Sequence, residues 1–187
     1  MKTLKRIYAE FICKAKNAGY SEDELVLGEG VPNGILIIGE APGRDEVAAG
    51  RPFVGKAGRI LDGILLKSGL SREELFVTNT VKFRPFKLSE KGTASNRPPT
   101  PAEISFCAEC FADEIEAVNP ELIITLGNIP LKAVTQESRI TIGEWHGMLT
   151  NIKGRRLFAM YHPASVIYNR KLEFVFEDDI KKLASIV

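Results

Sequence analysis

Four polar side chains follow apolar runs of this sequence and have the chemistry of a catalytic site. They are the carboxylates Glu40 and Glu46, the carboxamide Asn79 and the imidazole His162. A carboxamide presents a donor and an acceptor to a heterocyclic base, and an imidazole N–H can stabilise charge on a reacting carbonyl oxygen. Each also has a plainer reading, because an Asn often closes a turn and a lone His is usually structural. Their shared position at strand ends that converge in the fold favours one common site.

The segment after the first apolar run is rich in glycine, which lets backbone N–H groups approach a substrate closely. It reads GEAPGRDE and is followed by GRPFVGKAG. A nucleotide-binding turn is the alternative interpretation, but the sequence contains neither GxGxxG nor the P-loop pattern GxxxxGKS or GxxxxGKT. The segment therefore does not predict the usual phosphate cradle.

These side chains need a scaffold that brings separate strand ends together. Short β-branched runs bounded by Gly, Asn or Pro predict buried strands at Gly34–Gly39, Leu75–Asn79, Glu121–Gly127 and Arg156–Tyr161. Apolar spacing and capping residues predict helices at Thr3–Asn17, Lys56–Ser68, Pro101–Val118, Asn128–Thr135 and Leu172–Ile186. This alternation predicts an α/β fold, a three-layer α/β/α sandwich with a central four-stranded parallel sheet. Ligands of such sheets bind beyond the carboxyl ends of the strands, where the candidate residues lie.

Length and composition set wider limits on the protein. With 187 residues, 44% hydrophobic and 26% charged, the chain is expected to form a single domain over residues 1–187. The formal net charge of +1 does not indicate a nucleic-acid partner, so any DNA affinity needs a local basic patch. The sequence has neither a membrane-spanning apolar run nor a signal-peptide core, which predicts a cytoplasmic protein without a membrane partner. Three cysteines, an odd number, argue against a disulfide framework.

The motifs together are specific. The ordered segments GEAPG, GRPFVGKAG, VTNTVK, RP followed by NRPPTPAE, NPELIITLG and YHPA resemble the family-4 uracil-DNA glycosylases, the iron–sulfur type, over almost the whole chain. The resemblance implies an α/β/α sandwich that holds an extrahelical uracil. It further implies that Phe53 stacks on the flipped base, Asn79 bonds its Watson–Crick edge and His162 polarises the carbonyl nearest the sugar.

The resemblance also implies roles for the residues of the acidic turn. Glu40 and Ala41 correspond to the segment that lines the sugar and positions the water, and Glu46 matches a second acidic position. Hydrolysis of an N-glycosidic bond leaves positive charge on the sugar and negative charge on the base, so a carboxylate and a donor are both needed. Glu40 or Glu46 serves the first need and His162 the second. The sequence leaves open which of the two glutamates dominates.

The function implied is a base excision repair glycosylase that leaves an abasic site. Its expected partner is DNA that contains uracil or another deaminated base, and a monomer suits a DNA-scanning enzyme. Phosphate contacts are expected from Lys82, Arg84, Arg97 and Ser165. The alternative for each basic residue is an ordinary solvated surface charge.

The cysteines depart from the family pattern of four cluster ligands. Where the family has an N-terminal CxxC pair, only Cys13 is present, and Phe83 stands at the Cys of KCRP. Cys107 keeps its helical position, and Cys110 lies one turn further on. Because iron–sulfur clusters need about four thiolates, we expect the 4Fe–4S cluster to be lost and no cofactor to be used. Metal binding by Cys13, Cys107 and Cys110 is the alternative.

Two further departures concern DNA contact. His146 stands where the family usually has an Arg, and the stretch Phe86–Ser95 is longer than the usual link between the KCRP and NRxP motifs. The loss of cysteines motivates a second hypothesis, a catalytically weak or inactive member that binds nucleic acid. A third hypothesis, a nucleotide-using α/β enzyme, is disfavoured because no phosphate-binding fingerprint is present.

Overall fold

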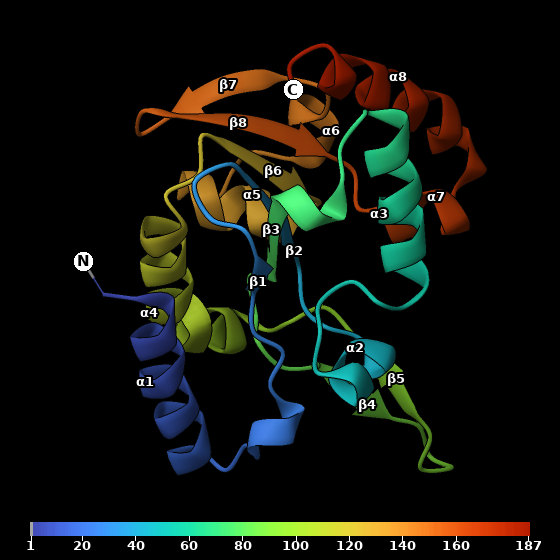
Figure 1. The fold of residues 1–187 in the computed structure, drawn as a ribbon. Helices are drawn as coiled ribbons and strands as arrows, with labels where there is room; N and C mark the ends of the chain where they lie inside the picture. The colour runs from blue at the N-terminus through green and yellow to red at the C-terminus, as the bar shows by residue number, and fades with distance from the viewer. Residues whose placement is uncertain (1) are drawn as a thin grey trace.

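One mixed sheet of six strands organises the fold, in the order β1-β3-β2-β6-β8-β7 (Figure 1). The computed structural model describes residues 2–187, apart from the side chains of residues 166–168 and 170. The central strands are parallel to one another: β3 (Leu75–Asn79), β2 (Ile35–Gly39), β6 (Leu122–Leu126) and β8 (Arg155–Met160). The edge strands β1 (Glu29–Gly30) and β7 (Leu149–Ile152) are antiparallel to their neighbours.

The expected four-stranded parallel sheet is therefore corrected to a six-stranded mixed one. The four predicted strands are present in its centre, with ends that differ by one residue at most. The sequence did not reveal β1, which has only two residues, or β7, whose residues are alternately exposed and half-buried. Edge strands lack the continuous apolar run that marks a strand buried on both faces.

Helices cover both faces of the sheet (Figure 1). Alternate residues of a strand point to opposite faces, so Ile37 packs in the cluster that includes side chains of α3 and α8. Leu36 and Ile38 pack in the cluster that includes side chains of α4, α5 and α6. The bounds are α1 (Leu4–Asn17), α2 (Arg44–Ala49), α3 (Lys56–Lys67), α4 (Pro101–Val118), α5 (Asn128–Thr135), α6 (Ile142–Trp145), α7 (Pro163–Tyr168) and α8 (Glu173–Ala184).

The five predicted helices are confirmed, and α4 and α5 have the predicted bounds. Thr100 caps α4 in the expected way. Its side chain accepts a hydrogen bond from the backbone N–H of Glu103, and the Glu103 carboxylate accepts one from the backbone N–H of Thr100. The short helices α2, α6 and α7 were not predicted, since four to six residues are too few to show an apolar period. None of the helices in the described part of the chain is both long and apolar enough to cross a membrane.

A separate two-stranded hairpin projects from the body of the molecule beside α2 (Figure 1). It consists of β4 (Phe86–Leu88) and β5 (Ala94–Asn96), paired antiparallel. Short 3-10 turns span Glu22–Glu24, Arg72–Glu74 and Arg170–Leu172. The hairpin accounts for the extra length noted in the sequence between the RP and NRPP motifs.

Candidate active site

The carboxyl ends of β2, β3 and β8 border one pocket of about 550 Å³. The register of the sheet places Gly39, the last residue of β2, opposite Asn79, the last residue of β3. The pocket is lined by Arg84, one of the expected phosphate contacts, and by five other residues singled out from the sequence: Ala41, Glu46, Phe53, Asn79 and His162. The topology therefore brings together side chains that lie up to 121 positions apart in the chain.

The pocket also draws on the loop between α2 and α3, which carries Phe53. A Cβ atom added to Gly39 would lie 2.4 Å from Oδ1 of Asn79 and 2.4 Å from Cζ of Phe53. Such contacts are far too short for a real side chain. The absence of a side chain at Gly39 therefore allows the Phe53 ring and the Asn79 amide to lie against the same strand end.

Phe53 has a left-handed backbone conformation, with φ of 55°, which is uncommon for a bulky residue. Arg72, in the turn before β3, stabilises this conformation. Its Nη1 donates to the carbonyl of Phe53 at 2.8 Å and to Asp62 at 3.0 Å, and its Nη2 donates to the carbonyl of Pro52. Arg72 was not identified from the sequence, where nothing distinguishes it from other surface arginines.

His162 lies at the N-cap of α7, immediately before Pro163. Its Nδ1 accepts a hydrogen bond from the backbone N–H of Ala164 at 3.1 Å. Burial lowers the pKa of His162 to about 4, against the opposing influence of the Glu46 charge. The imidazole is consequently neutral at pH 7, and because Nδ1 is an acceptor, Nε2 carries the proton and can donate to a ligand.

The depressed pKa of His162 predicts a loss of stability in acid. An unfolded histidine titrates near 6.5, whereas His162 in the fold titrates near 4. The unfolded state therefore binds a proton that the native state does not, and the stabilising contribution of neutral His162 is complete only above about pH 6.5. This contribution is lost as the pH falls to about 4. Free energies of unfolding measured from pH 7 to 4 should decline more steeply for wild type than for His162→Gln, and parallel curves would contradict this assignment.

Glu46 is buried at the third position of α2 and uses both carboxylate oxygens. The backbone N–H of Gly55 donates to Oε1 at 2.7 Å, and that of Gly43 donates to Oε2 at 3.0 Å. These bonds join the turn after β2 to the loop that carries Phe53. A Cβ atom at Gly43 or Gly55 would lie within 3 Å of the carboxylate, so both glycines permit the close approach.

Glu40 behaves differently from Glu46. It is half-buried, and it is not among the described residues that line the pocket. Burial raises the pKa of its carboxyl group above the ordinary value for glutamate. Its carbonyl accepts from the backbone N–H of Val81 at 3.0 Å and so joins the segments that follow β2 and β3. A catalytic role for Glu40 stays a prediction.

The expected phosphate contact by Lys82 is wrong. The side chain of Lys82 is fully buried and forms an ion pair with Glu114, which is also fully buried. Its Nζ donates to Thr78 Oγ1 at 2.7 Å and to the carbonyl of Asn79 at 2.8 Å, and Tyr8 completes the network with a 2.6 Å bond to Glu114. A lysine with three internal acceptors cannot reach DNA, and it instead supports the backbone of Asn79 from behind.

The sequence offered one signal for this buried network. Glu114 lies one turn after Cys110 and next to Ile115, on the apolar face of α4. A carboxylate on a buried face is rarely found without a partner. That pattern pointed to a buried cation, although it did not identify Lys82.

The three remaining phosphate candidates are partly engaged within the protein. Arg97 forms a bidentate pair with Glu103 at 2.7 Å and also bonds the carbonyls of Phe86 and Pro98. Arg84 lies at the pocket rim, where its Nε donates to Asn96 at 2.7 Å. Ser165 is half-buried, and its N–H donates to the carbonyl of His162. Contact of these residues with DNA stays a prediction.

The cysteine region has the side chains of an apolar core. Phe83 is buried and stacks on Tyr20 with ring centroids 4.3 Å apart, and it meets Phe106 edge-on at 6.1 Å. Cys107 and Cys110 are buried in the same cluster, whereas Cys13 is exposed on α1. Burial raises the pKa of both buried thiols, that of Cys110 to about 12. Three cysteines, one of them exposed on α1, and an apolar Phe83 at the remaining position do not supply the four thiolates of an iron–sulfur cluster.

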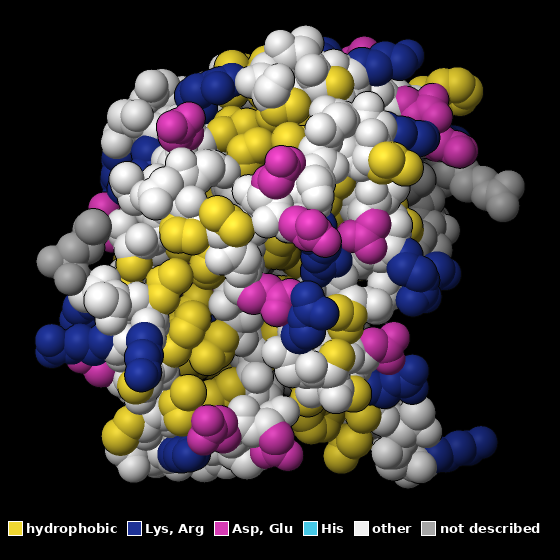
Figure 2. Space-filling model, in the orientation of Figure 1, with side chains coloured by type: hydrophobic (Ala, Val, Ile, Leu, Met, Phe, Trp, Pro, Cys, Tyr) yellow, Lys and Arg dark blue, Asp and Glu magenta, His cyan; other side chains and the backbone are white. Residues whose placement is uncertain are grey.

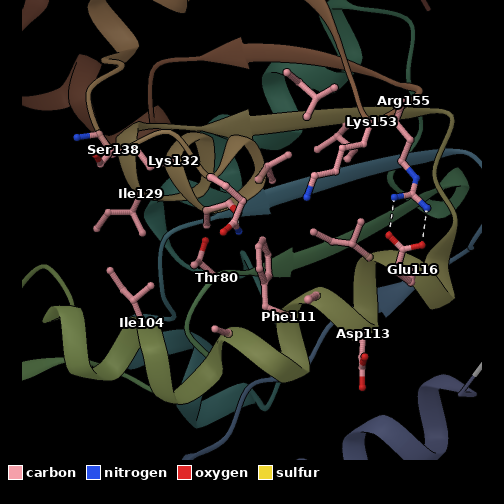
Figure 3. A pocket seen from close by; sticks show the side chains of 18 residues that line it. Thr80, Ile104, Phe111, Asp113, Glu116, Ile129, Lys132, Ser138, Lys153 and Arg155 are labelled. Carbon is pink, nitrogen blue, oxygen red and sulfur yellow. Dashed lines mark hydrogen bonds and ion pairs between the residues drawn. The ribbon is translucent and has the colours of Figure 1, made fainter.

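The described residues also contain no group of three or more His, Cys, Asp or Glu side chains arranged to hold a metal. A second pocket of about 500 Å³ lies between α4, α5 and the β7–β8 turn (Figure 3). Phe111 and Ile123 line it, and Arg155 pairs with Glu116 at its edge. It includes none of the residues predicted to be catalytic.

A neutral imidazole, a carboxamide and an aromatic ring beyond parallel strand ends give this α/β protein a pocket with the chemistry to bind a flat heterocycle that has hydrogen-bonding edges. A sequence model of the uracil DNA glycosylase superfamily matches residues 28–184. The type-4 uracil-DNA glycosylase of Sulfurisphaera tokodaii is 34% identical over 98% of this chain and 84% of its own. That of Archaeoglobus fulgidus is 35% identical over 81% of this chain and 76% of its own.

The chain therefore belongs to the uracil DNA glycosylase superfamily, with type-4 enzymes among its relatives. The crystal structure of SMUG2 from Pedobacter heparinus has the same fold, with a TM-score of 0.55 over 82% of this chain and 74% of that one. At 14% identity this likeness concerns the fold alone. The resemblance inferred from the motifs is confirmed.

Proposed function

We propose that this protein hydrolyses the N-glycosidic bond of uracil, or of a related deaminated base, flipped out of DNA, and leaves an abasic site. The observation that carries the proposal is the neutral His162, whose Nδ1 is occupied and whose Nε2–H is left as the donor. A neutral donor suits an oxygen that gains negative charge as the base departs. The names of the type-4 relatives support the same activity.

Each pocket residue has a part in this reaction. Phe53 stacks on the flipped base, and the amide of Asn79 bonds its Watson–Crick edge, which together offset the few kcal/mol needed to unstack a base. His162 stabilises the carbonyl oxygen next to the breaking bond. Ala41 lines the sugar, where a small side chain leaves room for water.

Glu46 is proposed as the main carboxylate. It lines the pocket, and its charge acts on His162, whereas Glu40 is not among the lining residues. Two backbone N–H groups fix its carboxylate in place, so that the negative charge can stabilise the positive sugar without reorganisation. Glu40 then has the lesser role of supporting the turn.

The test is a single-turnover assay on a labelled oligonucleotide with one uracil, followed by alkaline cleavage. Wild type is expected to cleave, and Glu46→Gln is expected to release uracil about 100-fold more slowly, with a smaller loss for Glu40→Gln. Equal losses of rate in the two variants would contradict the assignment of Glu46 as the main carboxylate, and a larger loss for Glu40→Gln would reverse it. Intact binding without cleavage by wild type, at any enzyme excess, would instead indicate a binding protein that lacks catalysis.

We also propose that the protein works without an iron–sulfur cluster. The support is the stacking of Phe83 on Tyr20 and the burial of Cys107 and Cys110 in the same apolar cluster. Protein purified without oxygen should be colourless, and a Cys107→Ser/Cys110→Ser variant should retain glycosylase activity. A brown colour with visible absorbance, together with loss of activity in the variant, would contradict the proposal.

A further inference from the structure

The β4–β5 hairpin forms one wall of the candidate active site. The residues of β5, Ala94, Ser95 and Asn96, line the pocket beside His162. Asn96 is anchored there, because its Oδ1 accepts from Nε of Arg84. The hairpin therefore borders the place where the flipped nucleotide must enter.

One face of the hairpin carries exposed apolar side chains. Phe86 is 46% exposed and Leu88 is 64% exposed. Directly paired residues of antiparallel strands project to the same face, and Phe86 pairs with Asn96 while Leu88 pairs with Ala94. Phe86 and Leu88 thus share a face of the hairpin with Asn96 and Ala94, which are two of the three β5 residues that line the pocket.

The charges of the hairpin as a whole suit a nucleic acid. The hairpin has two exposed lysines, Lys87 and Lys91, and one acidic residue, Glu90. The guanidinium of Arg84 lies 5.7 Å from the ring centroid of Phe86. Aromatic rings accompanied by cations are the usual surface on which unpaired bases stack beside a phosphate backbone. Basic side chains border the projecting lobe at the lower right of Figure 2.

We propose that the hairpin binds the DNA strand next to the flipped nucleotide, with the adjacent base stacked on Phe86 and Leu88. This inference rests on the proposed function, because the flipped nucleotide places its neighbour at the pocket rim. In an intact duplex both faces of that neighbour are covered by stacking. Removal of the flipped base exposes one face, and the hairpin supplies an apolar surface to cover it. Uracil in unpaired DNA, where bases unstack readily, is then the preferred substrate.

A protein–DNA double-mutant cycle tests the contact. The probe is a fluorescent single-stranded oligonucleotide with a central 2′-fluoro uracil nucleotide that resists hydrolysis, and affinity is measured by anisotropy. In matched probes a tetrahydrofuran spacer replaces the base on the 5′ or the 3′ side. Wild type is expected to lose about ten-fold in affinity for one of the spacer probes. Phe86→Ala/Leu88→Ala should bind the intact probe about ten-fold more weakly and be insensitive to the spacer.

A matched control uses two exposed apolar residues that lie on helices. Leu66 on α3 and Phe174 on α8 are 80% and 82% exposed, and neither lines the pocket. Leu66→Ala/Phe174→Ala removes the same two side-chain types and should respond to the spacer as wild type does. A spacer effect of equal size in the hairpin variant, or none in wild type, overturns the inference.

The proposed function is tested separately in the same preparations. Uracil release from an unmodified oligonucleotide by wild type reports on catalysis, whatever the hairpin does. Release without coupling between the hairpin and the neighbouring base would reject only the hairpin contact. Coupling without release would reject the glycosylase activity and retain the DNA-binding surface.

Discussion

Replacement of His162 by alanine is expected to lower the rate of uracil release by about 100- to 1,000-fold, the usual effect of losing one donor to a developing oxyanion. The substitution removes the Nε2–H while leaving Phe53 and Asn79 in place, so binding of the base should change little. The neutral form of His162 explains the size of the effect, since a buried N–H donor is not weakened by competing water. Single-turnover rates and oligonucleotide affinities, measured separately, should show the loss in the chemical step.

The second histidine of the chain provides the control. His146 lies outside the pocket, with Nδ1 3.1 Å from both carboxylate oxygens of Asp179. His146→Ala is expected to leave the rate of release near that of wild type, and His162→Gln should retain part of the activity because its amide is also a donor. A rate unaffected by His162→Ala would remove the central residue of the proposed mechanism.

Replacement of Lys82 by methionine is expected to destabilise the fold by about 3–5 kcal/mol, the cost of leaving a buried charge without its partner. Met fills much of the same space but provides no donor for Glu114, Thr78 Oγ1 or the carbonyl of Asn79. Glu114 would keep only the bond from Tyr8 and the one from Thr78. Denaturant unfolding gives the free energy directly.

An exposed ion pair serves as the comparison for Lys82. Lys182 pairs with Asp178 at 2.8 Å on the surface of α8, and Lys182→Met should lower the free energy of unfolding far less than Lys82→Met does. The double variant Lys82→Met/Glu114→Leu removes both buried charges and should recover much of the stability lost in Lys82→Met. Similar stabilities for Lys82→Met and Lys182→Met would show that the buried pair contributes little.

The cysteine region packs as an apolar cluster that includes Phe83. Through aromatic contacts, Phe106 of α4 joins Tyr20, which follows α1, and Phe83, which follows β3. Burial of a Phe side chain contributes on the order of 2 kcal/mol, so the buried Phe83 stabilises this region. The apolar residue at position 83 was readable from the sequence, whereas its partners Tyr20 and Phe106 were not.

The sequence by itself determined the framework and most of the pocket. Continuous apolar runs fixed the four central strands, because a strand buried on both faces tolerates few polar residues. Capping signals fixed the start of α4, since a Thr, Pro and Glu at those positions satisfy the free N–H groups of a helix end locally. The motifs at the strand ends identified His162, Asn79, Phe53 and Glu46, which the structure places around one pocket.

Only the tertiary structure determined which side chains are buried, which groups they pair with and whether they are charged. Lys82 reads as a surface base in the sequence, and only the packing of α1 and α4 against β3 shows that it is paired with Glu114 and buried. The left-handed conformation of Phe53 depends on Arg72, 19 residues further along the chain. The neutrality of His162 arises from burial among distant segments. Desolvation and hydrogen bonding depend on which groups are in contact in the folded protein. Residue type and spacing along the chain do not specify contacts between distant segments.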